Sequence, residues 1–120
     1  MFVSRWKPFS QEEISIMGAN AKANPKSRED TSEKKCPSCS QNSVRNYYRE
    51  YSRGVSWCWC RTCHKYIHFS IAPLSKAYIF NDPIADVPEM AGFKWYEFLD
   101  LKWEEGVLPQ VFKKKKGNKT

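Results

Sequence analysis

Four of the five cysteines form two Cys-x-x-Cys pairs, and they are Cys36, Cys39, Cys60 and Cys63. Two cysteines three positions apart can turn both sulfurs toward one point, and two such turns supply four soft ligands for a tetrahedral zinc ion. A site closed by four protein ligands keeps no position for water, so the pattern predicts one structural zinc ion. The alternatives are two disulfides or a redox-active dithiol.

Three neighbouring residues could also reach this site. Cys58 lies on the same strand face as Cys60, but only Cys60 completes a Cys-x-x-Cys pair, so we interpret Cys58 as a small buried apolar residue. His64 and His68 follow Cys63 closely and could replace a ligand or donate to a thiolate. The simpler interpretation is that both are ordinary residues of a hairpin.

The cysteine pairs require a hairpin to bring them together, and the segment between them predicts one. Strands are expected at Val44–Tyr51, Val55–Cys60 and Tyr66–Ser70, from their β-branched and aromatic residues and the turn at Gly54. Alternation places Val55, Trp57 and Trp59 on one face. We expect this face to pack against a C-terminal helix; the alternative is an exposed aromatic patch for a partner or for stacked bases.

Two helices are expected beside the hairpin. Ser10-Gln11-Glu12-Glu13 is a capping box that predicts a short helix ending near Gly18–Asn20. A second helix is expected within Glu89–Glu105, because apolar residues recur there at helical spacing and Gly106 follows as a stop signal.

The predicted fold is therefore a small α+β zinc ribbon, with three antiparallel strands and two knuckles, flanked by an N-terminal short helix and a C-terminal helix. The expected organisation has five parts, listed in chain order. They are an apolar segment and short helix at 1–20, a flexible linker at 21–35, the zinc ribbon at 36–72, a C-terminal helical segment packing on it at 73–112, and a basic disordered tail at 113–120.

The charge of the chain is unevenly distributed. The formal net charge is +7, but five of the twenty lysine and arginine residues lie in the last eight positions. Asp82–Glu105 is acidic, whereas Lys34–Lys65 is basic. Opposed charges of this kind favour either an acidic surface for a basic partner protein or a basic surface for nucleic acid.

The basic and acidic segments each contain candidate residues for contact with a partner. On the basic half, side chains suited to phosphates and bases are Arg45, Arg49, Arg53, Tyr47 and Tyr48. The alternative is a solvated hairpin face whose arginines lie over tyrosine rings or pair with the acidic helix. On the acidic half, Trp95 and Trp103 are candidate anchors for a protein partner.

Several classes of function are disfavoured. The first residues do not resemble a secretion signal, and no run approaches the roughly 18 apolar residues of a membrane helix. We therefore expect a cytoplasmic protein that does not bind membranes and is monomeric in isolation. We find no nucleophile with a base, no carboxylate pair in a recognisable motif and no phosphate-binding loop, so an enzyme is not expected.

The stretch CPSC followed by RGVSWCWCRTCHKYIHFS resembles small bacterial zinc-ribbon proteins encoded beside polymorphic or contact-dependent toxins, which act as immunity proteins. The resemblance covers about Cys36–Ser70, with a weaker echo in Lys102–Phe112. The matching positions are Trp57, Trp59, Cys60, Cys63 and His68. Cys58, the long N-terminal extension and the basic tail depart from that pattern.

Two hypotheses follow. The resemblance implies a non-enzymatic zinc-binding protein that neutralises a cognate toxin, its partner protein, by occluding it. The alternative is a zinc-ribbon protein that binds nucleic acid in transcription or its regulation, because the ribbon fold serves both kinds of protein.

Overall fold

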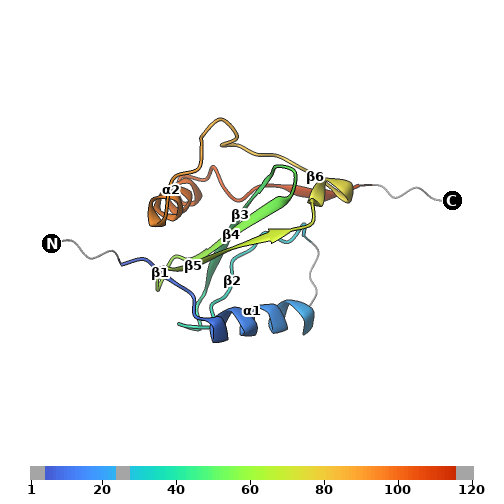
Figure 1. Ribbon diagram of the computed structural model, residues 1–120. Helices are drawn as coiled ribbons and strands as arrows, with labels where there is room; N and C mark the ends of the chain where they lie inside the picture. Colours follow the sequence, from blue (N-terminus) through green and yellow to red (C-terminus); the bar gives the residue numbers. More distant parts are fainter. Residues whose placement is uncertain (1–4, 24–27, 116–120) are drawn as a thin grey trace.

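The computed structural model describes residues 5–23 and 28–115 and shows a small α+β protein with two α-helices and a larger share of strand (Figure 1). The strands are β1 Lys7–Pro8, β2 Lys34–Lys35, β3 Asn42–Glu50, β4 Gly54–Cys60, β5 Lys65–Ile71, β6 Tyr78–Phe80 and β7 Phe112–Lys114. The α-helices are α1 Gln11–Ala23 and α2 Phe93–Glu104, and Leu74–Lys76 forms a 3-10 turn.

The main sheet has the spatial order β1-β5-β4-β3-β2. Its three central strands are antiparallel, with Tyr47 opposite Trp57 and Trp57 opposite His68, as the hairpin pattern predicts. Two short edge strands were not expected: β1 pairs parallel to β5, and β2 pairs antiparallel to β3. Each has only two residues, so neither carries a period that sequence reasoning could detect.

Helix α1 begins as predicted and continues further than predicted. The Ser10 backbone N–H donates to Glu13 Oε1 over 2.9 Å, and the Glu13 N–H donates to Ser10 Oγ over 3.1 Å, so the capping box is present. The helix extends to Ala23, because the alanines after Gly18 are strong helix formers. The flexible linker expected at 21–35 is therefore partly structured, because α1 occupies its start and β2 occupies its end. Residues 24–27 lie outside the described part of the chain.

Helices α1 and α2 cover opposite faces of the main sheet (Figure 1). Helix α2 packs on the face that carries Trp57 and Trp59, which are 5% and 0% exposed. The tryptophan stripe is thus core, as the packed interpretation predicts. The helix starts at Phe93 and not near Glu89, because Gly92, with a positive φ of 63°, directly precedes it.

The segment after α2 returns to the sheet instead of ending in a helical region. Strand β7 pairs with β6, and Phe112 and Phe80 stack on each other and meet Tyr48 edge-on on the second face of β3. Gln110 is 2% exposed; it accepts from the Tyr48 N–H and donates to the Tyr48 carbonyl, each over 2.8 Å. Lys113 and Lys114 belong to β7, which corrects the basic tail expected at 113–120; residues 116–120 lie outside the described chain.

Within the described residues, neither helix combines the length and the apolar character that crossing a membrane requires.

Candidate metal centre

The two cysteine turns have the same local geometry. In the first turn the Ser40 N–H donates to the Cys36 carbonyl, and in the second the His64 N–H donates to the Cys60 carbonyl, each over 2.9 Å. Ser40 and His64 both have a positive φ, of 66° and 62°. Each turn therefore reverses the chain directly after its second cysteine, which directs both sulfurs of the pair to one side.

The four sulfurs of the cysteine pairs converge on one point. Cys36 Sγ lies 3.7 Å from Cys63 Sγ, and Cys39 Sγ lies 3.6 Å from Cys60 Sγ. All four atoms lie within 4.8 Å of one another. A tetrahedral ion with metal–sulfur bonds of about 2.3 Å has sulfur–sulfur edges of about 3.8 Å. The sulfurs are thus placed to bind a metal ion.

The same distances argue against the disulfide and dithiol alternatives. A disulfide requires a sulfur–sulfur distance of about 2.05 Å, and all five cysteines are free. The distances of 3.7 Å from Cys36 to Cys63 and 3.6 Å from Cys39 to Cys60 join one turn to the other. Sulfurs from both turns, all within 4.8 Å of one another, fit four ligands around a common centre.

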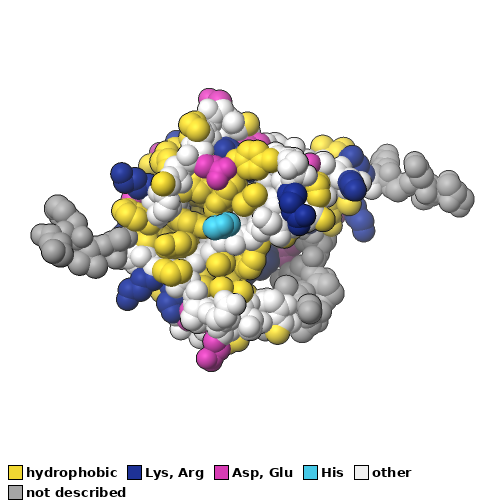
Figure 2. Space-filling view, in the orientation of Figure 1, with side chains coloured by type: hydrophobic (Ala, Val, Ile, Leu, Met, Phe, Trp, Pro, Cys, Tyr) yellow, Lys and Arg dark blue, Asp and Glu magenta, His cyan; other side chains and the backbone are white. Residues whose placement is uncertain are grey.

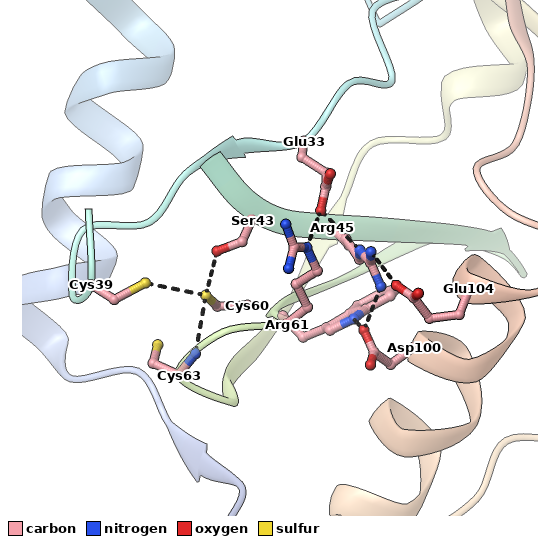
Figure 3. A network of polar contacts seen from close by, with 10 residues as sticks. Glu33, Cys39, Ser43, Arg45, Cys60, Arg61, Cys63, Asp100 and Glu104 are labelled. Carbon is pink, nitrogen blue, oxygen red and sulfur yellow. Dashed lines mark hydrogen bonds and ion pairs between the residues drawn. The ribbon is translucent and has the colours of Figure 1, made fainter. Parts of the chain in front are cut away.

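Polar groups around the sulfurs are suited to thiolate charge. Ser43 Oγ lies 3.0 Å from Cys60 Sγ, and the Cys63 N–H points at the same sulfur over 3.5 Å (Figure 3). The Ser38 N–H points at Cys36 Sγ over 3.4 Å. Donors of this kind stabilise bound thiolates and fix their orientation. The donor set therefore fits a bound divalent cation.

The thiols differ in their acidity because their surroundings differ. Burial raises the pKa of Cys36 to about 12, despite two N–H groups that favour the thiolate. Burial also opposes ionisation of Cys60, but the N–H groups of Cys63 and Thr62 and the Ser43 hydroxyl outweigh it and lower the pKa of Cys60 to about 7. A divalent cation would favour the thiolate form of every ligand.

Cys58, His64 and His68, the other possible ligands near the cysteine pairs, do not belong to the group of four sulfurs. Cys58 is half-buried, and its sulfur lies 3.3 Å from Asn46 Nδ2. His64 packs edge-on against Trp6, with ring centroids 4.9 Å apart, and His68 is exposed. Within the described residues, the candidate metal-binding group consists of the four paired cysteines alone.

A network of ion pairs begins directly beside the metal centre (Figure 3). Glu33 Oε2 accepts from Arg45 Nε over 3.0 Å and from Arg61 Nε over 2.9 Å. Arg45 also contacts Asp100 and Glu104 of α2 and lies over the Trp103 ring. Since Arg61 follows the ligand Cys60, the network joins the second cysteine turn to α2.

The structure places most of the candidate nucleic-acid residues in the interior. The side chains of Arg45 and Arg49 are 5% and 9% exposed, and Tyr47 and Tyr48 are 0% exposed. Only Arg53 of this set is exposed. The five residues therefore do not form one accessible basic and aromatic surface. Arg45 pairs with the acidic helix and Arg49 lies over the Tyr47 ring, but both side chains are buried and do not belong to a solvated face.

Arg49 and the two tyrosines have internal partners. Arg49 donates to Tyr47 Oη over 2.9 Å and to the Ile84 carbonyl over 2.8 Å, and Tyr47 Oη donates to Asp82 over 2.7 Å. Burial and the contact with Asp82 raise the pKa of Tyr47. Burial raises the pKa of Tyr48 to about 12, and its hydroxyl donates to Glu50.

The candidate anchors of the acidic half are also part of the core. Trp95 is 2% exposed and stacks with Phe98 on one side while meeting Tyr47 edge-on. Trp103 is half-buried against Trp59 and Arg45. A side chain that the sequence did not single out, Leu101, is 53% exposed on the outer side of α2.

Fold and site together define a small α+β protein with four cysteines positioned to bind a metal ion. Comparison with family models, curated proteins and solved structures found no match to this chain.

Proposed function

We propose that the four cysteines hold one structural zinc ion that completes a zinc ribbon, and that the protein acts without catalysis by binding another protein. The observation that carries the first part is the set of four sulfurs with crossed distances of 3.6 and 3.7 Å, close to the edge of a zinc–thiolate tetrahedron. Four thiolates saturate a tetrahedral zinc ion, so the metal supports the fold and does not activate water.

Burial of the basic side chains favours a protein partner over nucleic acid. Arg45 and Arg49 are committed to carboxylates, a carbonyl and aromatic rings inside the protein. A phosphate would have to displace those internal contacts and leave buried carboxylates unpaired, which is costly. Exposed residues such as Arg53, Lys113 and the neighbouring Tyr51 remain for the nucleic-acid alternative, but the buried arginines and tyrosines of β3 are not accessible to join them.

The outer face of α2 is the surface that best fits a basic protein partner. Leu101 is surrounded along the helix by exposed carboxylates at spacings of three to four residues, from Glu97, Glu104 and Glu105. Of these carboxylates Glu104 already pairs with Arg45 and Glu105 with Lys102. An exposed apolar residue flanked by carboxylates is suited to a partner with basic residues around an apolar pocket. The resemblance of Cys36–Ser70 to immunity proteins makes a cognate toxin the proposed partner.

The metal part is tested by elemental analysis of protein purified without added metal. One equivalent of zinc per chain supports the proposal. Another metal in stoichiometric amount, iron for example, would leave the ligand assignment in place and overturn the choice of zinc. Protein that folds stably with no metal would overturn both.

The partner is tested by affinity capture from the native source, after nuclease treatment and at moderate salt. A single stoichiometric protein is expected, and its capture should be lost with Leu101→Arg and retained with Ile79→Arg. Ile79 is a matched control because it is 62% exposed but lies on β6 and not on α2. Equal capture by both variants would overturn the α2 surface, and loss of all partners after nuclease treatment would favour nucleic acid.

A further inference from the structure

Strand β5 leaves part of one sheet edge open. On its inner side β5 pairs with β4 in an unbroken register from Tyr66 to Ile71. On its outer side β1 covers only Lys65 and Tyr66. Within the described residues, the segment Ile67–Ile71 therefore has no neighbouring strand on its outer side.

The other edges carry features that discourage pairing with a second chain. Strand β2 consists of two lysines and has a register shift against β3, and β1 ends in Pro8. Both strands of the small sheet are edges: β7 carries Lys113 and Lys114, and β6 has only three residues. Beyond Val44 the outer side of β3 has no neighbouring strand among the described residues either, but there the Gln110 side chain bonds to the N–H and C=O of Tyr48. Lysines, prolines, bulges and short length are the usual protections of an edge strand, and Ile67–Ile71 has none of them.

The backbone of this segment is oriented for pairing. The Tyr66 carbonyl accepts from the Phe9 N–H of the β1 side over 2.9 Å, so it points outward. Backbone polar groups of alternate residues point to the same side of a strand. His68 and Ser70 therefore present their N–H and C=O groups outward, while Ile67, Phe69 and Ile71 bond inward to β4.

The sequence of the open segment, Ile-His-Phe-Ser-Ile, is symmetric in its pattern of apolar and polar residues. If two copies pair antiparallel about Phe69, Ile67 lies opposite the partner's Ile71, and Phe69 lies opposite the partner's Phe69. His68 then lies opposite the partner's Ser70. All apolar pairs fall on one face and all polar pairs on the other, and no like-charged lysine or carboxylate pair is created.

Apolar side chains remain partly exposed at this edge. Ile67, Phe69 and Ile71 are half-buried in the single chain. Figure 2 shows hydrophobic side chains gathered on the face of the molecule that lies between α1 and α2, where β5 runs in Figure 1. Cross-strand pairing would remove part of this surface from water, which favours association.

We propose that the protein forms a two-fold symmetric homodimer in which β5 of each copy pairs antiparallel through Ile67–Ile71. The two main sheets then become one continuous sheet with Phe69 at the symmetry axis. A two-fold interface of this kind is closed, because each copy uses the same edge and no open edge segment of β5 is left over. The proposal replaces the monomer expected from the sequence, and it does not depend on the proposed function.

The first test is sedimentation of the metal-loaded chain over a range of concentrations. A dimer that dissociates on dilution is expected, and Phe69→Lys should raise its dissociation constant at least about tenfold by placing two like charges at the axis. Ile79→Lys, the matched change at another exposed apolar residue, should leave the constant unchanged. A chain that stays monomeric up to about 1 mM would overturn the proposal.

The second test reports the register and does not require Phe69→Lys to fold well. Opposed residues at a pair without backbone hydrogen bonds have Cα atoms about 4.5 Å apart, within disulfide range, whereas diagonal neighbours are about 7–8 Å apart. In a Cys58→Ala background, Phe69→Cys should therefore give a disulfide-linked dimer on mild oxidation, and Ser70→Cys should not. A dimer in which Ser70→Cys crosslinks and Phe69→Cys does not would overturn this register.

Discussion

Arg45 of β3 and Asp100 of α2 form an ion pair, with Arg45 Nη1 2.9 Å from Asp100 Oδ1, although 55 residues separate them. The same carboxylate oxygen accepts from Trp59 Nε1 over 2.8 Å. One side chain of α2 therefore satisfies a buried guanidinium on β3 and a buried indole on β4. This shared acceptor fixes how the helix is seated on the sheet, because moving α2 would break both bonds together.

Replacing Asp100 by alanine should therefore destabilise the protein markedly. The change leaves the buried Trp59 N–H without its acceptor and removes one of the carboxylates around Arg45, whose side chain is 5% exposed. Losses of this kind cost about 2–4 kcal/mol. Urea denaturation of the metal-loaded protein measures the loss in unfolding free energy.

Glu104→Gln is the matched control for Asp100. Glu104 also pairs with Arg45, but its side chain is 60% exposed, so water screens the interaction. The expected loss is at most about 1 kcal/mol. Equal losses for the two variants would show that the network acts through net charge and not through the buried geometry of Asp100.

The cluster of four cysteines can be predicted from the sequence because it depends on the spacing of residues that lie close together in the chain. Each Cys-x-x-Cys pair sets its own turn, and the intervening strands are long enough to show alternation, so the sequence alone predicts that the four cysteines converge. The capping box at Ser10 and Glu13 was equally local. Features that depend on residues a few positions apart can be recognised in a single chain.

The burial of Arg45 and Arg49 could not be predicted from local spacing, because it depends on partners that lie far away in the sequence. Arginine on a strand suggests a solvent-exposed face unless the acceptors are known, and here they come from α2 and from the segment around Asp82 and Ile84. One feature of the sequence does indicate that Arg45 is buried. Antiparallel pairing places Arg45 opposite Trp59 on the sheet face that carries the core, so period-two alternation implies that this arginine is covered.

Loss of one metal ligand should unfold the region around the cysteine turns. Cys63→Ser removes one of four converging sulfurs, and since metal binding and folding are coupled, we expect loss of stoichiometric metal and of about 5 kcal/mol or more of stability. Elemental analysis gives the metal content, and hydrogen exchange at β3 and β4 reports the structural loss.

Cys58→Ala provides the comparison for that variant. Cys58 lies on the same strand as Cys60 but outside the group of four sulfurs. The variant should retain one equivalent of metal. If it instead lost metal as Cys63→Ser does, the assignment of Cys60 and its three partners as the complete ligand set would be wrong.

Ser43 should tune metal affinity without being a ligand. Its hydroxyl lies 3.0 Å from Cys60 Sγ and is fully buried, so Ser43→Ala removes a donor that no water readily replaces. Loss of such a supporting hydrogen bond weakens metal affinity by about 10–100-fold. Competition with a chelator measures the change. Ser38→Ala is the control, because Ser38 donates to Cys36 Sγ from its backbone N–H, which the substitution retains.

Glu13 should make the attachment of α1 to the sheet dependent on pH. Its carboxylate contacts Lys65 Nζ of β5 over 2.7 Å and caps the helix through the Ser10 N–H. The contact with Lys65, followed by the Ser10 N–H, lowers the pKa of Glu13 from 4.5 to about 2. Because the folded-state pKa lies below the unfolded one, this contribution is complete above about pH 4.5 and is lost as the pH falls toward 2.

The Glu13→Gln variant isolates that contribution. It should be less stable than the wild type near neutral pH, and the difference should shrink as the pH falls through the same window, because both proteins then carry a neutral side chain at this position. Protonation of the cysteines affects both proteins alike, so it cancels in the difference between their urea midpoints. Glu12→Gln, at an exposed neighbour in the same turn, is the control for the loss of one carboxylate. A difference between Glu13→Gln and wild type that stays constant from pH 6 down to the lowest pH at which both proteins keep their metal would show that the Lys65 contact does not contribute through charge.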